Sequence, residues 1–117
     1  MLDGKRRRAE SYETSQGRSP LELWVKSLDF RAGTKILVRI RRAQAGNFGT
    51  YRGLGERLFE LKEDSGPGYR VYFGLTRAGL GEEIIVLLAG GTKGSQTRDI
   101  ERARRYWIDY KARTRME

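Results

Sequence analysis

Hydrophobic residues recur along this chain with a helical period in some segments and with a two-residue period in others. The segment "RSPLELWVKSL" shows the helical spacing i, i+3, i+4, i+7 at Leu21, Trp24, Val25 and Leu28. Ser19 is a suitable N-cap, Pro20 falls at the first helical position, and Glu22 follows the cap by three residues. These features predict a short amphipathic helix over about residues 20–28.

Two further segments carry the helical pattern. One helix is predicted over about residues 31–44, and the "GN" at 46 and 47 would end it. Its inward face would carry Ile36, Leu37, Ile40 and Ala43. The other helix is predicted over residues 97–113, with Asp99 in its first turn and basic residues in its last turn, as the helix dipole favours. Its apolar stripe would consist of Ile100, Ala103 and Trp107.

Strand patterns fill the region between these helices. The segments "RLFELK" (57–62) and "YRVYFGL" (69–75) alternate between apolar and polar positions, and the turn sequence "EDSGPG" joins them into a predicted hairpin. The segment "EIIVLLA" (83–89) is continuously apolar, which is typical of a central strand covered on both faces. The segment "AESYET" (9–14) is a weaker candidate for a first strand.

This order of segments predicts an α+β fold. It would have two N-terminal helices, a three- to four-stranded, mainly antiparallel sheet and a C-terminal helix. The helices would lie on one face of the sheet and leave the other partly open. Residues 1–117 would form one domain, in which residues 1–10 are expected to be a disordered basic arm around "KRRR" at 5–8.

Charge and composition narrow the possible functions. Twenty-four Lys and Arg against 15 Asp and Glu give a net charge of +9, which favours a polyanionic partner such as nucleic acid or the ribosome. No apolar run is long enough for a membrane span, and the N-terminus lacks the pattern of a signal peptide, so we expect a cytoplasmic protein with no membrane partner. The chain has neither cysteine nor histidine. This composition argues against a metal site and against a Ser–His or Cys–His nucleophile, and no cofactor is expected.

Cations are predicted to gather on the face of the sheet opposite the core. Neighbouring antiparallel strands place side chains of one face about 5 Å apart. Glu60 and Lys62 would therefore lie beside Arg70 and Tyr72, and the exit of the following strand would bring Lys93 to the same end. Arginine and lysine bind phosphate, and a tyrosine can stack on a base, so this surface could grip a phosphodiester.

The same motifs carry a resemblance to a known family. "GERLFELKEDSGPGYRVYFGL", followed by "IIVLLAGGTKGSQTRDIERARRYWIDY", resembles the RelE/ParE toxin superfamily, in particular its HigB-like branch of addiction module killer proteins. The motifs "ELWVKSL", "GNFGTYRGLGERLFEL" and "GGTKGSQTRDI" occur in the order of that group, and the resemblance covers about residues 18–112.

The resemblance implies a RelE-like fold and a metal-independent endoribonuclease that cleaves mRNA, usually on the ribosome, as the toxin of a type II toxin–antitoxin system. It also implies a cognate antitoxin, often a helix-turn-helix protein of the HigA type. The family's basic positions match Arg70, Lys62 and Lys93, and Glu60 stands where some relatives have a second lysine. Candidate catalytic residues are therefore Arg70, Lys93, Lys62 and Glu60, and the candidate RNA contacts are Tyr72, Arg57, Gln96 and Arg98.

Several alternatives remain open at this point. Arg70 could form a cross-strand salt bridge with Glu60, Tyr72 could pack beneath the C-terminal helix, and Gln96 could simply begin that helix. The proton of the 2′-hydroxyl could go to Lys62 or to Glu60. The protein could also be a non-catalytic, ParE-like inhibitor of DNA gyrase, or a degenerate relative that only binds RNA.

Overall fold

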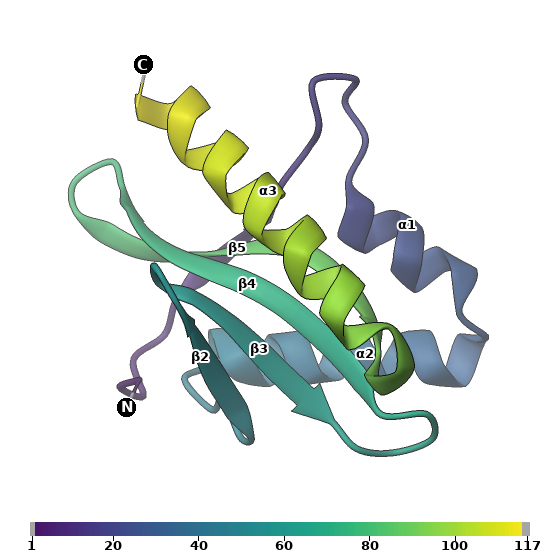
Figure 1. Cartoon of the computed structure of the whole chain (residues 1–117). Coiled ribbons are helices and arrows are strands. Elements are labelled where there is room, and N and C mark those ends of the chain that lie inside the picture. The colour runs from purple at the N-terminus through teal and green to yellow at the C-terminus, as the bar shows by residue number, and fades with distance from the viewer. Residues whose placement is uncertain (1, 116–117) are drawn as a thin grey trace.

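The computed structural model of the protein describes residues 2–115, so Met1, Met116 and Glu117 lie outside the described residues. A strand, β1 (Arg8–Ser11), is followed by two helices, α1 (Pro20–Ser27) and α2 (Phe30–Gln44). Four strands come next: β2 (Tyr51–Gly55), β3 (Leu58–Glu63), β4 (Tyr69–Ala78) and β5 (Glu82–Thr92). A short 3₁₀ turn, η1 (Lys93–Ser95), leads into the long helix α3 (Gln96–Arg115) (Figure 1).

The sheet differs from the predicted one in size and direction. It has five strands in the order β1-β5-β4-β3-β2, where three or four were expected. β1 runs parallel to β5, and the other neighbouring strands are antiparallel, so the sheet is mixed. The predicted fold class, a RelE-like arrangement with a three- to four-stranded, mainly antiparallel sheet behind two N-terminal helices, is therefore wrong for this structure. The strand before the helices, a weaker candidate over residues 9–14, is present as β1, and a β2–β3 hairpin extends the far edge.

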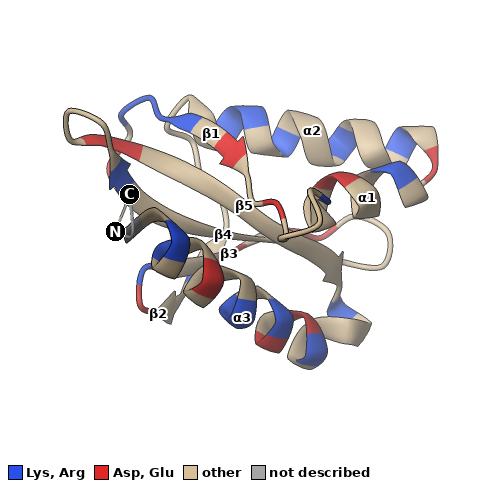
Figure 2. Ribbon diagram, turned by 90° about the horizontal axis from the view of Figure 1, so that it is seen from above, with Lys and Arg blue, Asp and Glu red and all other residues tan. Residues whose placement is uncertain are grey.

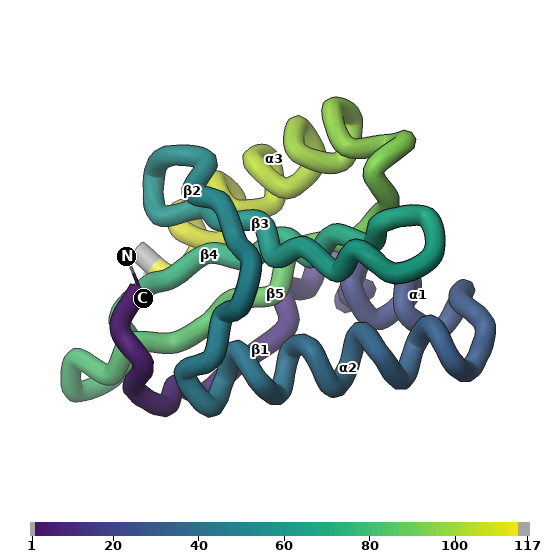
Figure 3. The backbone as a smooth tube through the Cα atoms, turned by 90° about the horizontal axis from the view of Figure 1, so that it is seen from below, coloured from purple at the N-terminus to yellow at the C-terminus, as the bar shows by residue number. Residues whose placement is uncertain are grey.

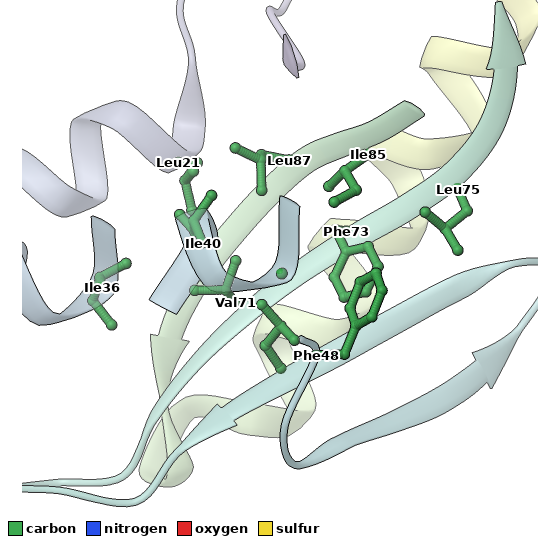
Figure 4. Close-up of a cluster of buried hydrophobic side chains, with 11 residues drawn as sticks. Leu21, Ile36, Ile40, Phe48, Val71, Phe73, Leu75, Ile85 and Leu87 are labelled. Carbon is green, nitrogen blue, oxygen red and sulfur yellow. The ribbon is translucent and has the colours of Figure 1, made fainter. Parts of the chain in front are cut away.

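Helices cover both faces of the sheet, which corrects the expectation of one open face. α1 and α2 lie on one side and α3 on the other (Figures 2 and 3). The first side holds a core of α1, α2 and strand residues, in which Ile36, Ile40, Val71, Phe73 and Leu75 are buried (Figure 4). The second side holds a separate core between the sheet and α3, built from Leu58, Tyr72, Ile84, Val86, Leu88 and Trp107.

The strand alternation explains these two cores. In β4, Val71, Phe73 and Leu75 face α1 and α2, as the alternation predicted. The other face of β4 carries Tyr72 and Gly74, and it is buried against α3 rather than solvated. Gly74 has no side chain because the ring of Trp107 occupies that space; an added Cβ would come within 2.5 Å of the indole.

The ends of the first two helices follow from their caps. The Ser19 hydroxyl accepts a hydrogen bond from the Glu22 N–H (3.2 Å), which confirms the N-cap expected from the sequence. The Asp29 carboxylate does the same for Ala32 (2.9 Å) and fixes the start of α2. Pro20 is the first residue of α1.

The N-terminal basic cluster is tied to the sheet rather than extended away from it. Arg8 begins β1, and Arg7 is only 5 % exposed. The Arg7 guanidinium donates to Glu83 on β5 (2.8 Å) and to Asp3 (3.1 Å). Glu83 also pairs with Arg57 of the β2–β3 turn, so one carboxylate joins the first segment of the chain to the hairpin.

On α2, Leu37, which the sequence placed on the inward face, is 50 % exposed, whereas Arg39, which it did not place there, is buried. Its side chain is buried, and its guanidinium donates to the backbone carbonyls of Phe48 and Thr50. Burial lowers the pKa of Arg39, and the nearby carboxylate of Glu63 opposes that shift. Arg39 thus orders the loop between α2 and β2.

Tyr12 gives a pH-dependent test of how α3 is held to the sheet. Its hydroxyl donates to Asp109 on α3 (2.6 Å), and burial together with this carboxylate raises its pKa from 10 to about 12. A raised pKa in the folded state means that the contribution to stability is complete below pH 10 and is lost as the pH rises towards 12. We expect the free energy of unfolding of wild type to fall over this range more steeply than that of Tyr12→Phe, measured by denaturant titration at each pH. Parallel curves for the two proteins would contradict this assignment.

Candidate functional site

Three cations converge at the end of the sheet where β3, β4 and β5 meet the 64–68 turn. Lys62 lies directly opposite Arg70 across β3 and β4, and Arg70 lies opposite Gly91 of β5. Lys93 follows two residues later, and its N–H donates to the carbonyl of Gly68 (2.8 Å). A Cβ on Gly68 would lie 3.3 Å from Cβ of Lys93 and 3.4 Å from Nη1 of Arg70, so these two side chains flank the same point. We call Lys62, Arg70 and Lys93 the cation cluster.

Arg70 lies beneath the surface of this cluster, not on an open face. Its side chain is only 6 % exposed, whereas Lys93 is exposed and Lys62 is half-buried. Its Nη1 donates to the Tyr69 carbonyl (3.1 Å) and lies 3.8 Å from Asp64, which is itself exposed. Its Nε is buried and has no hydrogen-bond partner among residues 2–115. The guanidinium is therefore incompletely satisfied, which is costly for a buried charge.

Glu60 is fully buried beside the cluster. One carboxylate oxygen accepts from Nε2 of Gln96 (2.8 Å), and the other lies 3.2 Å from Nη2 of Arg52. The cross-strand pair between Glu60 and Arg70, which the sequence left open, is not what forms: Glu60 pairs with Arg52 and Arg70 faces Asp64. With no exposed surface, Glu60 cannot meet a 2′-hydroxyl in this conformation.

Tyr72 is sealed under α3 and is not placed to stack on a base. Its side chain has no exposed surface, and its hydroxyl is buried next to the carboxylate of Glu60. Burial, followed by the negative charge of Glu60, raises its pKa well above the ordinary value. Of the two roles considered for this residue, packing beneath the C-terminal helix is the one that the structure supports.

The first turn of α3 packs against β3 and β5 beside the cation cluster. Gln96 begins this helix, which is one of the two roles considered for it, and its side-chain amide also donates to the buried Glu60. Asp99, which the sequence suggested only as a favourable first-turn acid, is buried against β5. Its carboxylate accepts from Ser95, and a Cβ on Gly91 would collide with it at 1.8 Å. The "GG" of "GGTK" is the signal that could have revealed this close packing.

The two remaining candidate RNA contacts lie in different places. Arg98 is exposed on the first turn of α3, beside the cluster. Arg57 lies in the β2–β3 turn, where it donates to the Leu75 carbonyl (3.2 Å) and pairs with Glu83. Lys62 lies four positions after Leu58 along β3, which is about 14 Å at roughly 3.4 Å per residue, so Arg57 lies at the opposite end of the sheet.

The arrangement suits the binding of an oxyanion. Two of its cations reach the surface, and the third presents an unpartnered N–H just below it. Positive groups that are held in place before a reaction stabilise negative charge that develops on a phosphate. Within residues 2–115, no group of three or more His, Cys, Asp or Glu residues could hold a metal ion, and no helix is long and apolar enough to cross a membrane.

Comparison with known proteins identifies a relative. The chain is 42 % identical over 82 residues to an uncharacterized protein of Haemophilus influenzae, and the match covers 69 % of this chain and 79 % of the relative. The chain belongs to the family of that protein. No family model and no solved structure matches the chain.

Proposed function

We propose that this protein is a metal-independent mRNA endoribonuclease, the toxin of a type II toxin–antitoxin system of the RelE/ParE superfamily. The observation that carries the proposal is the cation cluster, in which the buried guanidinium of Arg70 keeps an N–H free beside the lysines at positions 62 and 93. A buried charge of this kind is costly to the fold, and such costs are concentrated at functional sites. The net charge of +9 favours a nucleic acid as the substrate.

The reaction would use the RNA's own nucleophile. The ribose 2′-oxygen attacks the adjacent phosphorus while its proton is removed, and the bond from phosphorus to the 5′-oxygen breaks. The products are a 2′,3′-cyclic phosphate and a 5′-hydroxyl, which receives a proton as it leaves. The crowded phosphorane carries more negative charge than the ground state, so fixed cations lower the barrier selectively.

Each member of the cluster has a distinct role in this proposal. Arg70 binds the non-bridging oxygens, and Lys93 assists it from the exposed end of β5. An RNA phosphate would take the place of Asp64, the carboxylate that lies 3.8 Å from Arg70. Lys62 is the candidate to accept the 2′-hydroxyl proton, which it can do only as the neutral amine, because Glu60 has no exposed surface; Glu60 instead anchors Gln96 and Arg52.

The proposed partners follow from the same function. The substrate would be mRNA, bound at the ribosome in the cytoplasm, where ribosomal RNA can hold the strand in line for attack. A helix-turn-helix antitoxin would neutralise the protein by covering the cation cluster.

Cell-free translation with the purified protein tests the proposal directly. We expect primer extension to reveal new 5′ ends within the translated mRNA, and these ends should carry 5′-hydroxyl groups. The variant Lys93→Ala tests the role of the cluster. It should cleave at least about tenfold more slowly than wild type, because one fixed cation is lost. Intact mRNA, together with inhibition of DNA supercoiling by gyrase, would instead support the gyrase-directed alternative.

A further inference from the structure

A second surface feature lies between α1 and α3 and is not used by the cleavage mechanism. It is a groove of about 500 Å³, which we call the aromatic groove; its main walls are Pro20, Leu23 and Trp24 of α1, Arg102 and Tyr106 of α3, and Arg18 of the preceding loop. In Figure 1, α3 crosses the sheet in front of the loop that leads into α1. The volume lies within the range of small-ligand pockets, about 300–1,000 Å³.

The two rings of the groove are held in fixed positions. Trp24 lies flat on β5, since a Cβ on Gly90 would fall 2.0 Å from the indole, and the ring is still half-buried rather than sealed. Tyr106 stacks on Tyr12 with ring centroids 5.0 Å apart and an interplanar angle of 26°. The half-buried Trp24 is an ordered ring, and such a ring loses little entropy when a flat ligand stacks on it.

Of the two cations of the groove, Arg18 is available to a ligand and Arg102 is paired within the protein. Arg18 is exposed, and its guanidinium has no hydrogen bond or ion pair within residues 2–115. Its backbone is fixed by Thr14, whose hydroxyl accepts from the Arg18 N–H (3.4 Å). The Arg102 guanidinium lies 5.9 Å above the Tyr106 ring and 3.3 Å from Asp99.

Asp99 connects this groove to the cation cluster. The same carboxylate contacts Arg102 on one side and packs against Gly91 on the other, and Gly91 is the β5 partner of Arg70. The groove and the cluster therefore meet at the first turns of α3. Any strand that enters the cluster would have its neighbouring nucleotides close to the groove.

We propose that the aromatic groove binds unpaired bases of the RNA strand next to the cleaved phosphate. A base would stack on Trp24, and Arg18 and Arg102 would contact the flanking phosphates. Stacking combined with arginine is the usual chemistry for single-stranded RNA, whereas a duplex offers no free base faces. This inference rests on the proposed ribonuclease function for the identity of its ligand.

Fluorescence of Trp24 provides the test. The probe is a 2′-O-methyl RNA heptamer, which cannot be cleaved because its 2′-oxygen is blocked. The chain has two tryptophans, and Trp107 is only 2 % exposed, so quenching reports on Trp24. We expect saturable quenching by the single strand and little by the same sequence in a duplex. Trp24→Phe should abolish the quenching while the far-UV circular dichroism is retained.

Two arginine variants distinguish specific RNA binding in the groove from non-specific electrostatic attraction to the basic surface. Arg18→Ala should weaken binding of the heptamer about fivefold or more, since one phosphate contact and the adjoining stacking are lost. Arg41→Ala is the control, because Arg41 is an exposed arginine on α2, away from the groove. Equal weakening by the two variants, the absence of quenching, or equal quenching by an acidic peptide would overturn the inference.

The outcome for the groove is independent of the outcome for cleavage. Saturable, Arg18-dependent binding without any mRNA cleavage would retain the groove and reject the nuclease. Cleavage by wild type without any quenching would retain the nuclease and reject the groove.

Discussion

Replacing Arg70 by methionine should slow mRNA cleavage by about 100-fold or more while the protein stays at least as stable as wild type. The loss of rate follows from removing the cation placed to stabilise the phosphorane, an effect of about 10²–10³ for one such donor. The stability expectation follows from burial: methionine fills a similar volume without a charge whose Nε is unpartnered. Cleavage assays and urea unfolding of the same preparations measure the two effects.

Arg77→Met is the matched control for this experiment. Arg77 lies on the same strand, β4, but it is exposed at the opposite end and donates to the Gly81 carbonyl. It should cleave at the wild-type rate. If Arg70→Met instead loses more than about 2 kcal/mol of stability, the residue is structural, and the proposed role of the cation cluster fails.

Removing the indole of Trp107 should cause the largest loss of stability. Trp107→Ala is expected to lower the free energy of unfolding by about 3–5 kcal/mol, because a large buried ring is replaced by a cavity. The ring fills the space over Gly74, and its Nε1 donates to the Glu56 carbonyl (2.8 Å). That bond supports a turn in which Glu56 and Arg57 both have positive φ, a strained conformation for residues other than glycine.

The neighbouring Ile108 offers the control for Trp107. Ile108 is 64 % exposed on the same helix, so Ile108→Ala should change stability by no more than about 0.5 kcal/mol. Thermal unfolding followed by circular dichroism would compare the two variants. Equal losses would mean that α3 is held to the sheet by something other than this ring.

The sequence predicted best those features that depend on interactions between residues close together in the chain. Ser19 and Pro20 placed the start of α1 correctly, because capping depends on residues within one turn. The alternation of 69–75 placed β4 and identified the residues that face α1 and α2. The lysine of "GGTK" was expected near Arg70, and the register of β4 and β5 brings the two together.

Features that depend on distant segments were missed. The strand β2 has two glycines in five residues, and its turn to β3 contains no glycine at the positive-φ positions, so neither element shows its usual signal. Nothing local in "RAES" reveals that it pairs in parallel with β5. The burial of the β4 face that carries Arg70 was missed for a similar reason. The alternation of a strand shows that it has two faces, but not what packs against the second face.

The parallel pairing of β1 with β5 has a consequence for synthesis of the protein. Arg7 and Glu83, which join these two segments, are 76 residues apart in the chain. A nascent chain emerges from the ribosome at about 5–20 residues per second, so the first strand waits several seconds for its neighbour. Lys93 and helix α3 follow later still. The parallel ladder between β1 and β5 can therefore form only after nearly the whole sheet has been synthesised.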